Sequence, residues 1–196
     1  MHAQLIPAND ARTAPGPEAL LLQRAADGDR RAFSELARLL ARPALALAVR
    51  VLGDRALAED AVQEALARLW REAHRFDPAR GSFAGWWRRI LMNCALDGRR
   101  RLRPAAPIEA AADIPDTGPT PLRAAEEADL AARVQAAAAG LPERQRAALA
   151  LFHGDGLTMT EIAQALNSSE KAVEGLLLRG RAALKERLTD LKDELE

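Results

Sequence analysis

The chain has 196 residues, 48% of them hydrophobic, and its 28 basic and 28 acidic side chains give a net charge of zero. This length allows one large or two small folded domains. A single cysteine excludes an internal disulfide, no apolar run reaches the ~18 residues of a membrane span, and the N-terminus lacks a signal-peptide core. We therefore expect a soluble, cytoplasmic protein. We also expect no metal site, because the three histidines and the cysteine lack ligand spacing.

The zero net charge conceals an asymmetry along the chain. Residues 19–103 carry 17 basic and 10 acidic side chains, a net charge of +7. Residues 104–127 carry one basic and five acidic side chains, a net charge of −4. A basic half followed by an acidic connector indicates nucleic-acid binding in the first half of the chain.

The beginning of the chain combines an irregular segment with a helical one. Residues 1–18 contain three prolines and few bulky apolar side chains, which predicts a disordered arm. From about Leu20 the apolar residues recur with a helical period. A first helix is interrupted at residues 27–29, and a second begins near Arg31 and is expected to bend or break at Pro43.

Residues 56–74 form a predicted amphipathic helix. Its apolar positions lie three and four residues apart: Ala58, Val62, Ala65, Leu66, Leu69 and Ala73. The other face carries Asp60, Gln63 and Glu64, which lie side by side and could meet a basic or amide-rich groove. Taken alone, these three residues are more simply explained as a solvated helix face.

The most informative segment is 81–103, where Phe83, Trp86 and Trp87 lie beside six arginines and a single acid, Asp97. Two adjacent residues of a helix point about 100° apart, so one narrow apolar stripe cannot easily bury both tryptophans. Arginine neutralises phosphate and aromatic rings stack on unpaired bases. The segment therefore indicates binding to single-stranded or melting DNA. A core tryptophan beside a solvated basic face is the alternative.

From residue 76 onward the sequence predicts a loop, a linker and further helices. A loop at residues 76–82 precedes a helix predicted from about residue 83 to 100. Five prolines between residues 104 and 121 predict an extended linker and a domain boundary. Helix resumes near Ala124, stops at Gly140 and begins again after Pro142.

Residues 158–184 have a helix-turn-helix pattern. Thr158 and Glu161 have capping-box spacing at the start of a short helix, and residues 167–169 can cap a second helix beginning near Glu170. The expected apolar stripe consists of Ile162, Ala163, Leu166, Val173, Leu176, Leu177 and Leu184. Many helical hairpins of this kind bind no nucleic acid.

These motifs, in this order, resemble the extracytoplasmic-function (group IV) sigma factors of bacterial RNA polymerase. The matching segments are DAVQEAL at 60–66, residues 83–89 and 90–103, LPERQR at 141–146, and DGLTMTEIAQAL at 155–166 with the helix that follows. The resemblance implies an all-α fold of two small helical domains joined by a Pro-rich flexible linker. The expected divisions are an arm (1–18), sigma region 2 (19–103), a linker (104–125), sigma region 4 (126–190) and a tail (191–196).

The resemblance also implies roles for particular residues. Asp60, Gln63 and Glu64 would dock on the clamp coiled coil of core polymerase. The residues expected to melt and bind the −10 element are Phe76, Phe83, Trp86, Trp87, Arg88, Arg89, Asn93, Arg99, Arg100 and Arg101. In the family, a flipped non-template base enters a pocket formed by the loop that corresponds to residues 76–83, and Asn93 would supply a hydrogen-bonding wall. Asn93 could instead be an ordinary polar residue, and the last three arginines a solvated helix end.

The residues expected to contact the −35 element are Ser169, Lys171, Glu174, Arg179 and Arg181. Many family members place basic residues in the middle of this recognition helix, where this chain has Glu174, Gly175 and Leu176. Glu174 can accept a hydrogen bond from a cytosine amine. Weak −35 binding, with promoter choice resting on the −10 element, is the alternative.

The resemblance implies core RNA polymerase, promoter DNA and an anti-sigma factor as partners, with no cofactor or small-molecule substrate. No catalytic triad, acid–base pair or phosphate loop indicates an enzyme. Two other binding functions stay open: a sigma-like mimic that sequesters a regulator, and an ordinary helix-turn-helix regulator. The tryptophans and arginines of segment 81–103 argue against the mimic, and the ordinary regulator leaves them unexplained.

Overall fold

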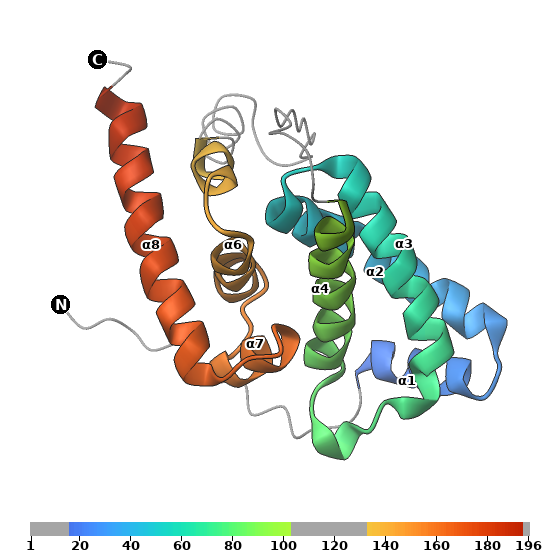
Figure 1. Cartoon of the computed structure of the whole chain (residues 1–196). Coiled ribbons are helices and arrows are strands. Elements are labelled where there is room, and N and C mark those ends of the chain that lie inside the picture. The colour runs from blue at the N-terminus through green and yellow to red at the C-terminus, as the bar shows by residue number, and fades with distance from the viewer. Residues whose placement is uncertain (1–15, 103–132, 194–196) are drawn as a thin grey trace, which may run out of the picture.

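The computed structural model describes residues 16–102 and 133–193, and these residues form helices and turns with no strand. They form two groups of helices that lie side by side (Figure 1). We call residues 16–102 the N-terminal unit and residues 133–193 the C-terminal unit. The predicted all-α fold is confirmed for this part of the chain. Within the described residues, every helix is too short or too polar to span a membrane.

The N-terminal unit consists of α1 (Pro17–Ala26), α2 (Arg30–Leu52), α3 (Arg55–Glu72), two short 3-10 turns, η1 (Ala73–Arg75) and η2 (Pro78–Arg80), and α4 (Phe83–Leu102). Helix α1 begins at Pro17, inside the predicted arm. Proline is well tolerated in the first turn of a helix, because a backbone N–H there would have no helical acceptor. Helix α2 continues through Pro43, so, of the bend or break expected there, the break does not occur. Leu40, Ala44 and Leu47 are buried on its inner face, and this packing holds the helix together.

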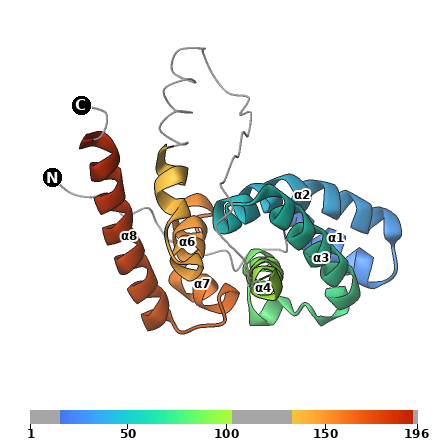
Figure 2. The same cartoon turned by 45° about the horizontal axis from the view of Figure 1, so that its top comes forward.

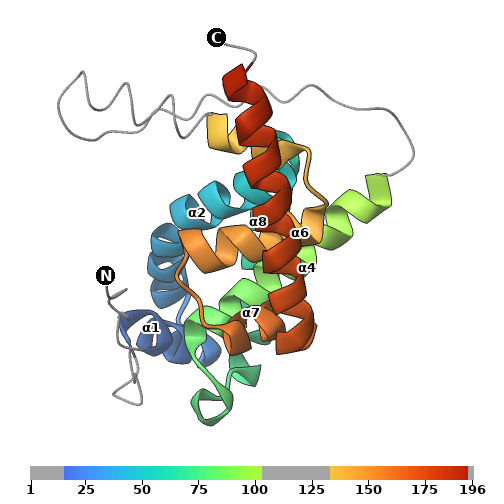
Figure 3. The ribbon, with the colours of Figure 1, turned by 90° about the vertical axis from the view of Figure 1, so that its left-hand side faces the viewer.

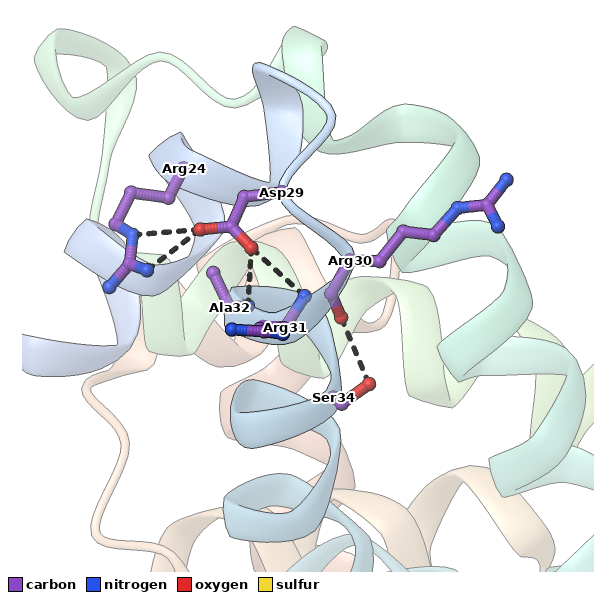
Figure 4. Close-up of polar contacts among 6 residues, drawn as sticks. All are labelled: Arg24, Asp29, Arg30, Arg31, Ala32 and Ser34. Carbon is purple, nitrogen blue, oxygen red and sulfur yellow. Dashed lines mark hydrogen bonds and ion pairs between the residues drawn. The ribbon is translucent and has the colours of Figure 1, made fainter.

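Asp29 shapes the turn between α1 and α2 (Figure 4). Its carboxylate caps α2 by accepting hydrogen bonds from the backbone N–H groups of Arg31 at 2.9 Å and Ala32 at 3.0 Å. The same carboxylate accepts a hydrogen bond from Nη2 of Arg24, in the last turn of α1, at 2.7 Å. The hydrogen bonds from Ala32 and Arg24 lower the pKa of Asp29 below its ordinary range. One side chain thus joins the two helices and satisfies exposed backbone donors.

The C-terminal unit consists of a helix over residues 133–139, α6 (Glu143–Leu149), the π-helical turn η3 (Ala150–Gly154), α7 (Met159–Ala165) and α8 (Glu170–Asp193). The predicted capping box is present, with Thr158 Oγ1 accepting from Glu161 N and a Glu161 carboxylate oxygen accepting from Thr158 N. Between α7 and α8, Asn167 adopts a left-handed φ of 47°. Ser169 Oγ then caps α8 by accepting from Ala172 N at 3.2 Å. The predicted helix-turn-helix is therefore confirmed.

The two units share one hydrophobic core. Helix α4 packs against α3 on one side and α7 on the other, and α2 packs against α6 and η3 (Figure 2). Helix α8 packs against α6 and α7 and crosses α6 (Figure 3). The predicted linker lies outside the described residues, as do most of the predicted arm and half of the predicted tail.

Candidate nucleic-acid interface

A cavity of about 200 Å³ lies at the connection between α3 and α4. Its walls include the aromatic rings of Phe76 and Trp86 and the basic side chains of Arg75, Arg80 and Arg89. Gln164, from α7 of the C-terminal unit, completes the lining. The cavity thus combines flat apolar surfaces with cations and an amide, the groups that bind a base and its phosphates, and it also includes the carboxylate of Asp77.

The aromatic residues of this connection form a cluster. The ring of Phe76 lies edge-on to Phe83, with centroids 5.9 Å apart, and its centroid is 5.4 Å from that of Trp86. The centroids of Phe83 and Trp86 are 6.5 Å apart, so every pair is within the range of favourable aromatic contacts. All three side chains are half-buried. The cluster therefore holds the loop in shape, and two of its rings, Phe76 and Trp86, present aromatic surface to the cavity, which Phe83 does not line.

Trp87 differs from its neighbour and corrects one expectation. Its side chain is 0% exposed, packed in the core, whereas Trp86 remains half-buried at the cavity. A rotation of about 100° per residue turns the two rings to different sides of α4. The sequence argument that one stripe cannot bury both is confirmed. The expectation that Trp87 presents its ring to DNA is wrong for this conformation.

The polar residues predicted on α4 occupy different environments. Arg89 is exposed and lines the cavity, but Arg88 is largely buried and forms an ion pair with Asp155 of the C-terminal unit. Asn93 lies about 10 Å along the helix from Trp86 and is not among the residues that line this cavity, so its role as a wall for the flipped base stays a prediction. Gln164 supplies the amide there instead. The side chains of Arg99, Arg100 and Arg101 lie outside the described residues.

The polar face of α3 is exposed as predicted. Asp60, Gln63 and Glu64 all lie at the surface. Glu64 accepts hydrogen bonds from Nε of Arg68 at 3.0 Å and from Nη2 of Arg71 at 3.2 Å. The hydrogen bond from Arg68 is the main reason that the pKa of Glu64 is lowered. A partner that binds this face must therefore compete with Arg68 and Arg71, on the same helix, for the Glu64 carboxylate.

Most of the polar residues predicted on α8 are also at the surface. Lys171, Glu174 and Arg179 are exposed. Ser169 is exposed too, but its hydroxyl is used in the cap described above. Arg181 turns toward η3, where it lies over the ring of Phe152 at 5.1 Å and donates to His153 Nε2 at 3.3 Å.

Leu178 is a surface residue of α8 that the sequence analysis did not single out. Its side chain is 71% exposed. It lies four residues after Glu174 and seven after Lys171, on the same helical face. Of the predicted apolar stripe, Val173 and Leu177 are buried while Leu176 and Leu184 are half-buried. The sequence signal for its exposure was that Leu178 is an apolar residue of this helix outside the predicted buried stripe.

The described residues contain no group of three or more His, Cys, Asp or Glu side chains placed to hold a metal ion.

Comparisons with known proteins match both units. The model of sigma-70 region 2 matches residues 36–104, and that of sigma-70 region 4 matches residues 131–184. The ECF RNA polymerase sigma factor SigE of Mycolicibacterium smegmatis is 35% identical over 169 residues, covering 83% of this chain and 65% of that protein. The ECF RNA polymerase sigma factor SigW of Bacillus subtilis is 30% identical over 174 residues, covering 84% of this chain and 92% of that protein. CnrH, solved in complex with the cytosolic domain of CnrY, is similar in structure, with a TM-score of 0.64, 30% identity, and coverage of 89% of this chain and 98% of CnrH.

Proposed function

This chain belongs to the extracytoplasmic-function sigma factors of the sigma-70 family, and from that premise we propose that it binds core RNA polymerase, recognises −10 and −35 promoter elements and melts the −10 duplex. The observation that carries the melting step is the cavity between α3 and α4, with its aromatic and basic walls. The match to region 2 also removes the alternative of an ordinary helix-turn-helix regulator.

In the melting step, a base that leaves the duplex enters this cavity. Phe76 and Trp86 provide surfaces on which the base stacks, which offsets the loss of pairing and stacking in the duplex. Arg80 and Arg89 neutralise the flanking phosphates. No bond is made or broken in this step, so we assign the protein no catalytic activity.

The exposed face of α3 is the surface that we propose for core polymerase. Asp60 and Gln63 offer a carboxylate and an amide one turn apart to a basic or amide-rich groove. Glu64 contributes charge, but a partner must compete with Arg68 and Arg71 for its carboxylate. Because core polymerase acts in the cytoplasm, we place the protein there.

Helix α8 is the element that we propose for the −35 duplex, as the second helix of the helix-turn-helix. Lys171 suits a phosphate or a guanine edge, and Glu174 suits a cytosine amine. Leu178, exposed on the same face, suits a thymine methyl group. Because the middle of this helix carries Glu174, Gly175 and Leu176 and no basic residue, we propose that contacts here contribute less to affinity than the −10 contacts do.

A protein partner that holds the factor inactive also fits this chain. The similar protein CnrH is solved with the cytosolic domain of CnrY bound to it. We propose that an anti-sigma factor binds this chain in the same general way.

Run-off transcription tests the proposed function directly. Purified core polymerase and this protein are incubated with a pool of random genomic fragments, and the transcripts are sequenced. We expect discrete 5′ ends that require the protein and share two upstream elements. Transcripts no different from those of core polymerase alone would contradict the function.

A further inference from the structure

Asp77 places a carboxylate in the wall of a cavity that is otherwise suited to nucleic acid. Among the described residues that line the cavity it is the only acid, and it lies with the guanidinium groups of Arg75, Arg80 and Arg89. Its negative charge opposes the phosphates that the arginines attract, because like charges repel. A carboxylate in this place therefore lowers the affinity for DNA unless it accepts a hydrogen bond from the ligand.

The local backbone holds this carboxylate in place. Oδ1 of Asp77 caps the turn η2 by accepting a hydrogen bond from the backbone N–H of Ala79 at 2.9 Å. Pro78 follows directly and favours an extended conformation for the residue before it, which Asp77 adopts with φ −120° and ψ 109°. The side chain is exposed, and its second oxygen, Oδ2, accepts no hydrogen bond from the described residues. Oδ2 is thus the oxygen that a ligand in the cavity can use.

The other polar groups of the wall distinguish less well between bases. The hydroxyl of Ser82 already accepts from Gly85 N at 3.1 Å and donates to Glu161 Oε1 at 2.6 Å. The amide of Gln164 can both donate and accept, so it suits an amine and a carbonyl equally. The arginines carry donors in a planar arrangement that matches phosphate oxygens. Asp77 is therefore the lining residue whose hydrogen bond depends on which base enters.

We propose that Asp77 selects the flipped base, so that the cavity prefers adenine and cytosine to thymine and guanine. Adenine and cytosine carry an exocyclic amine on the Watson–Crick edge, from which a carboxylate oxygen accepts a hydrogen bond. Thymine and guanine carry a carbonyl oxygen at the same position, which a carboxylate repels. Pairing of both carboxylate oxygens with guanine is disfavoured, because Oδ1 is held by Ala79. This rests on the proposed function, since it takes the cavity as the site of the flipped base.

Transcription from a promoter library tests this preference. Run-off transcription with core polymerase first locates the −10 element, and each of its positions is then varied through all four bases. For the parent we expect a position at which adenine or cytosine supports about tenfold more transcript than thymine or guanine. A parent that shows no such position would overturn the proposal.

Two substitutions of Asp77 change this hydrogen bond in different ways. In Asp77→Asn the amide oxygen still accepts from Ala79 N, but a donor replaces the free oxygen, so the preference at that position should change to thymine or guanine. In Asp77→Ser the hydroxyl can keep the cap but offers no second acceptor, so the preference should be lost without reversing. The control is Asp27→Asn, which removes an exposed negative charge from a residue that does not line the cavity. We expect it to keep the preference of the parent.

The outcomes separate this proposal from the proposed function. If the variants initiate with the same base preference as the parent, the function stands and the proposal fails, because Asp77 then only caps η2. The same change of preference in Asp27→Asn would also overturn the proposal, because net charge would then explain it. A parent that supports no initiation contradicts both. Thermal unfolding shows which variants are folded, and either substitution of Asp77 is sufficient for the comparison.

Discussion

Two adjacent tryptophans of α4 show how one residue step decides a side chain's role. Trp86 stands in the aromatic cluster at the cavity, and Trp87 is buried with its indole N–H lacking an acceptor among the described residues. The contribution of Trp87 is therefore packing. The contribution of Trp86 is divided between holding the loop and presenting a surface to DNA.

Substitution by alanine should separate these roles. Trp87→Ala removes a fully buried indole and should lower the free energy of unfolding by about 3–5 kcal/mol. Trp86→Ala should cost less, because part of that ring already contacts solvent. Urea denaturation followed by circular dichroism measures both values. A larger loss of stability for Trp86→Ala than for Trp87→Ala would mean that Trp86, and not Trp87, is the core residue.

At the scale of elements, α3 carries a polar face that the fold does not use for packing. Asp60 and Gln63 are exposed, while the buried stripe of the same helix includes Ala58, Val62 and Ala65. The surface is thus available for a partner without any change in the core.

Changing Asp60 and Gln63 to alanine should weaken binding to core polymerase and leave stability within about 0.5 kcal/mol, as is usual for surface positions. Pull-down of core polymerase against protein concentration measures the affinity, and thermal unfolding measures the stability. Glu35→Ala, which removes an exposed acid from α2, is the matched control. Undiminished capture of polymerase by the double variant would show that this face is not the docking surface.

Glu161 takes part in the capping box at the start of α7 and also accepts a hydrogen bond from Ser82 of the N-terminal unit. Burial raises the pKa of this carboxyl, but hydrogen bonds from Ser82 and from the backbone and hydroxyl of Thr158 outweigh burial, and the pKa is lowered overall. A carboxyl with a lowered pKa in the folded state stabilises it at pH values above its ordinary pKa. This contribution is lost as the pH falls through the lowered value.

The parent should therefore lose stability on acidification faster than Glu161→Gln, which keeps an oxygen acceptor for Thr158 but has no charge to titrate. The measurement is the urea midpoint of both proteins from neutral pH to below the ordinary range of a glutamate. The difference between the midpoints should shrink as the pH falls. Parallel curves would mean that the ionised carboxylate contributes nothing to the fold.

At the scale of the whole molecule, local features could be predicted from the sequence and contacts between distant residues could not. The capping box of Thr158 and Glu161 and the helix-turn-helix were predictable because their signals span only a few residues. The ion pair of Arg88 and Asp155 joins residues 67 positions apart and has no local signal. The place of Gln164 in the cavity depends in the same way on how the two units pack.

The candidate site could be predicted only in part, because some of its features depend on contacts between residues far apart in the sequence. The helical period excluded burial of both tryptophans in one stripe, but only the packing of α4 between α3 and α7 decided that Trp87 is the buried one. Asn93 was expected at the cavity from the family resemblance, yet it lies two turns away along α4. Phe76 of the loop and Trp86 of α4 were both expected at the −10 site, and the structure places their rings together.

The central claim, that this protein opens promoter DNA through the cavity at Trp86, is tested most directly by permanganate reactivity of −10 thymines with core polymerase. Trp86→Ala removes stacking worth about 1–3 kcal/mol per base but leaves the arginines, so duplex binding and its salt dependence should change little. Thymine reactivity on intact duplex should fall about tenfold or more, and a pre-melted template should restore much of the transcription. Equal reactivity of the parent and Trp86→Ala on intact duplex would contradict the claim.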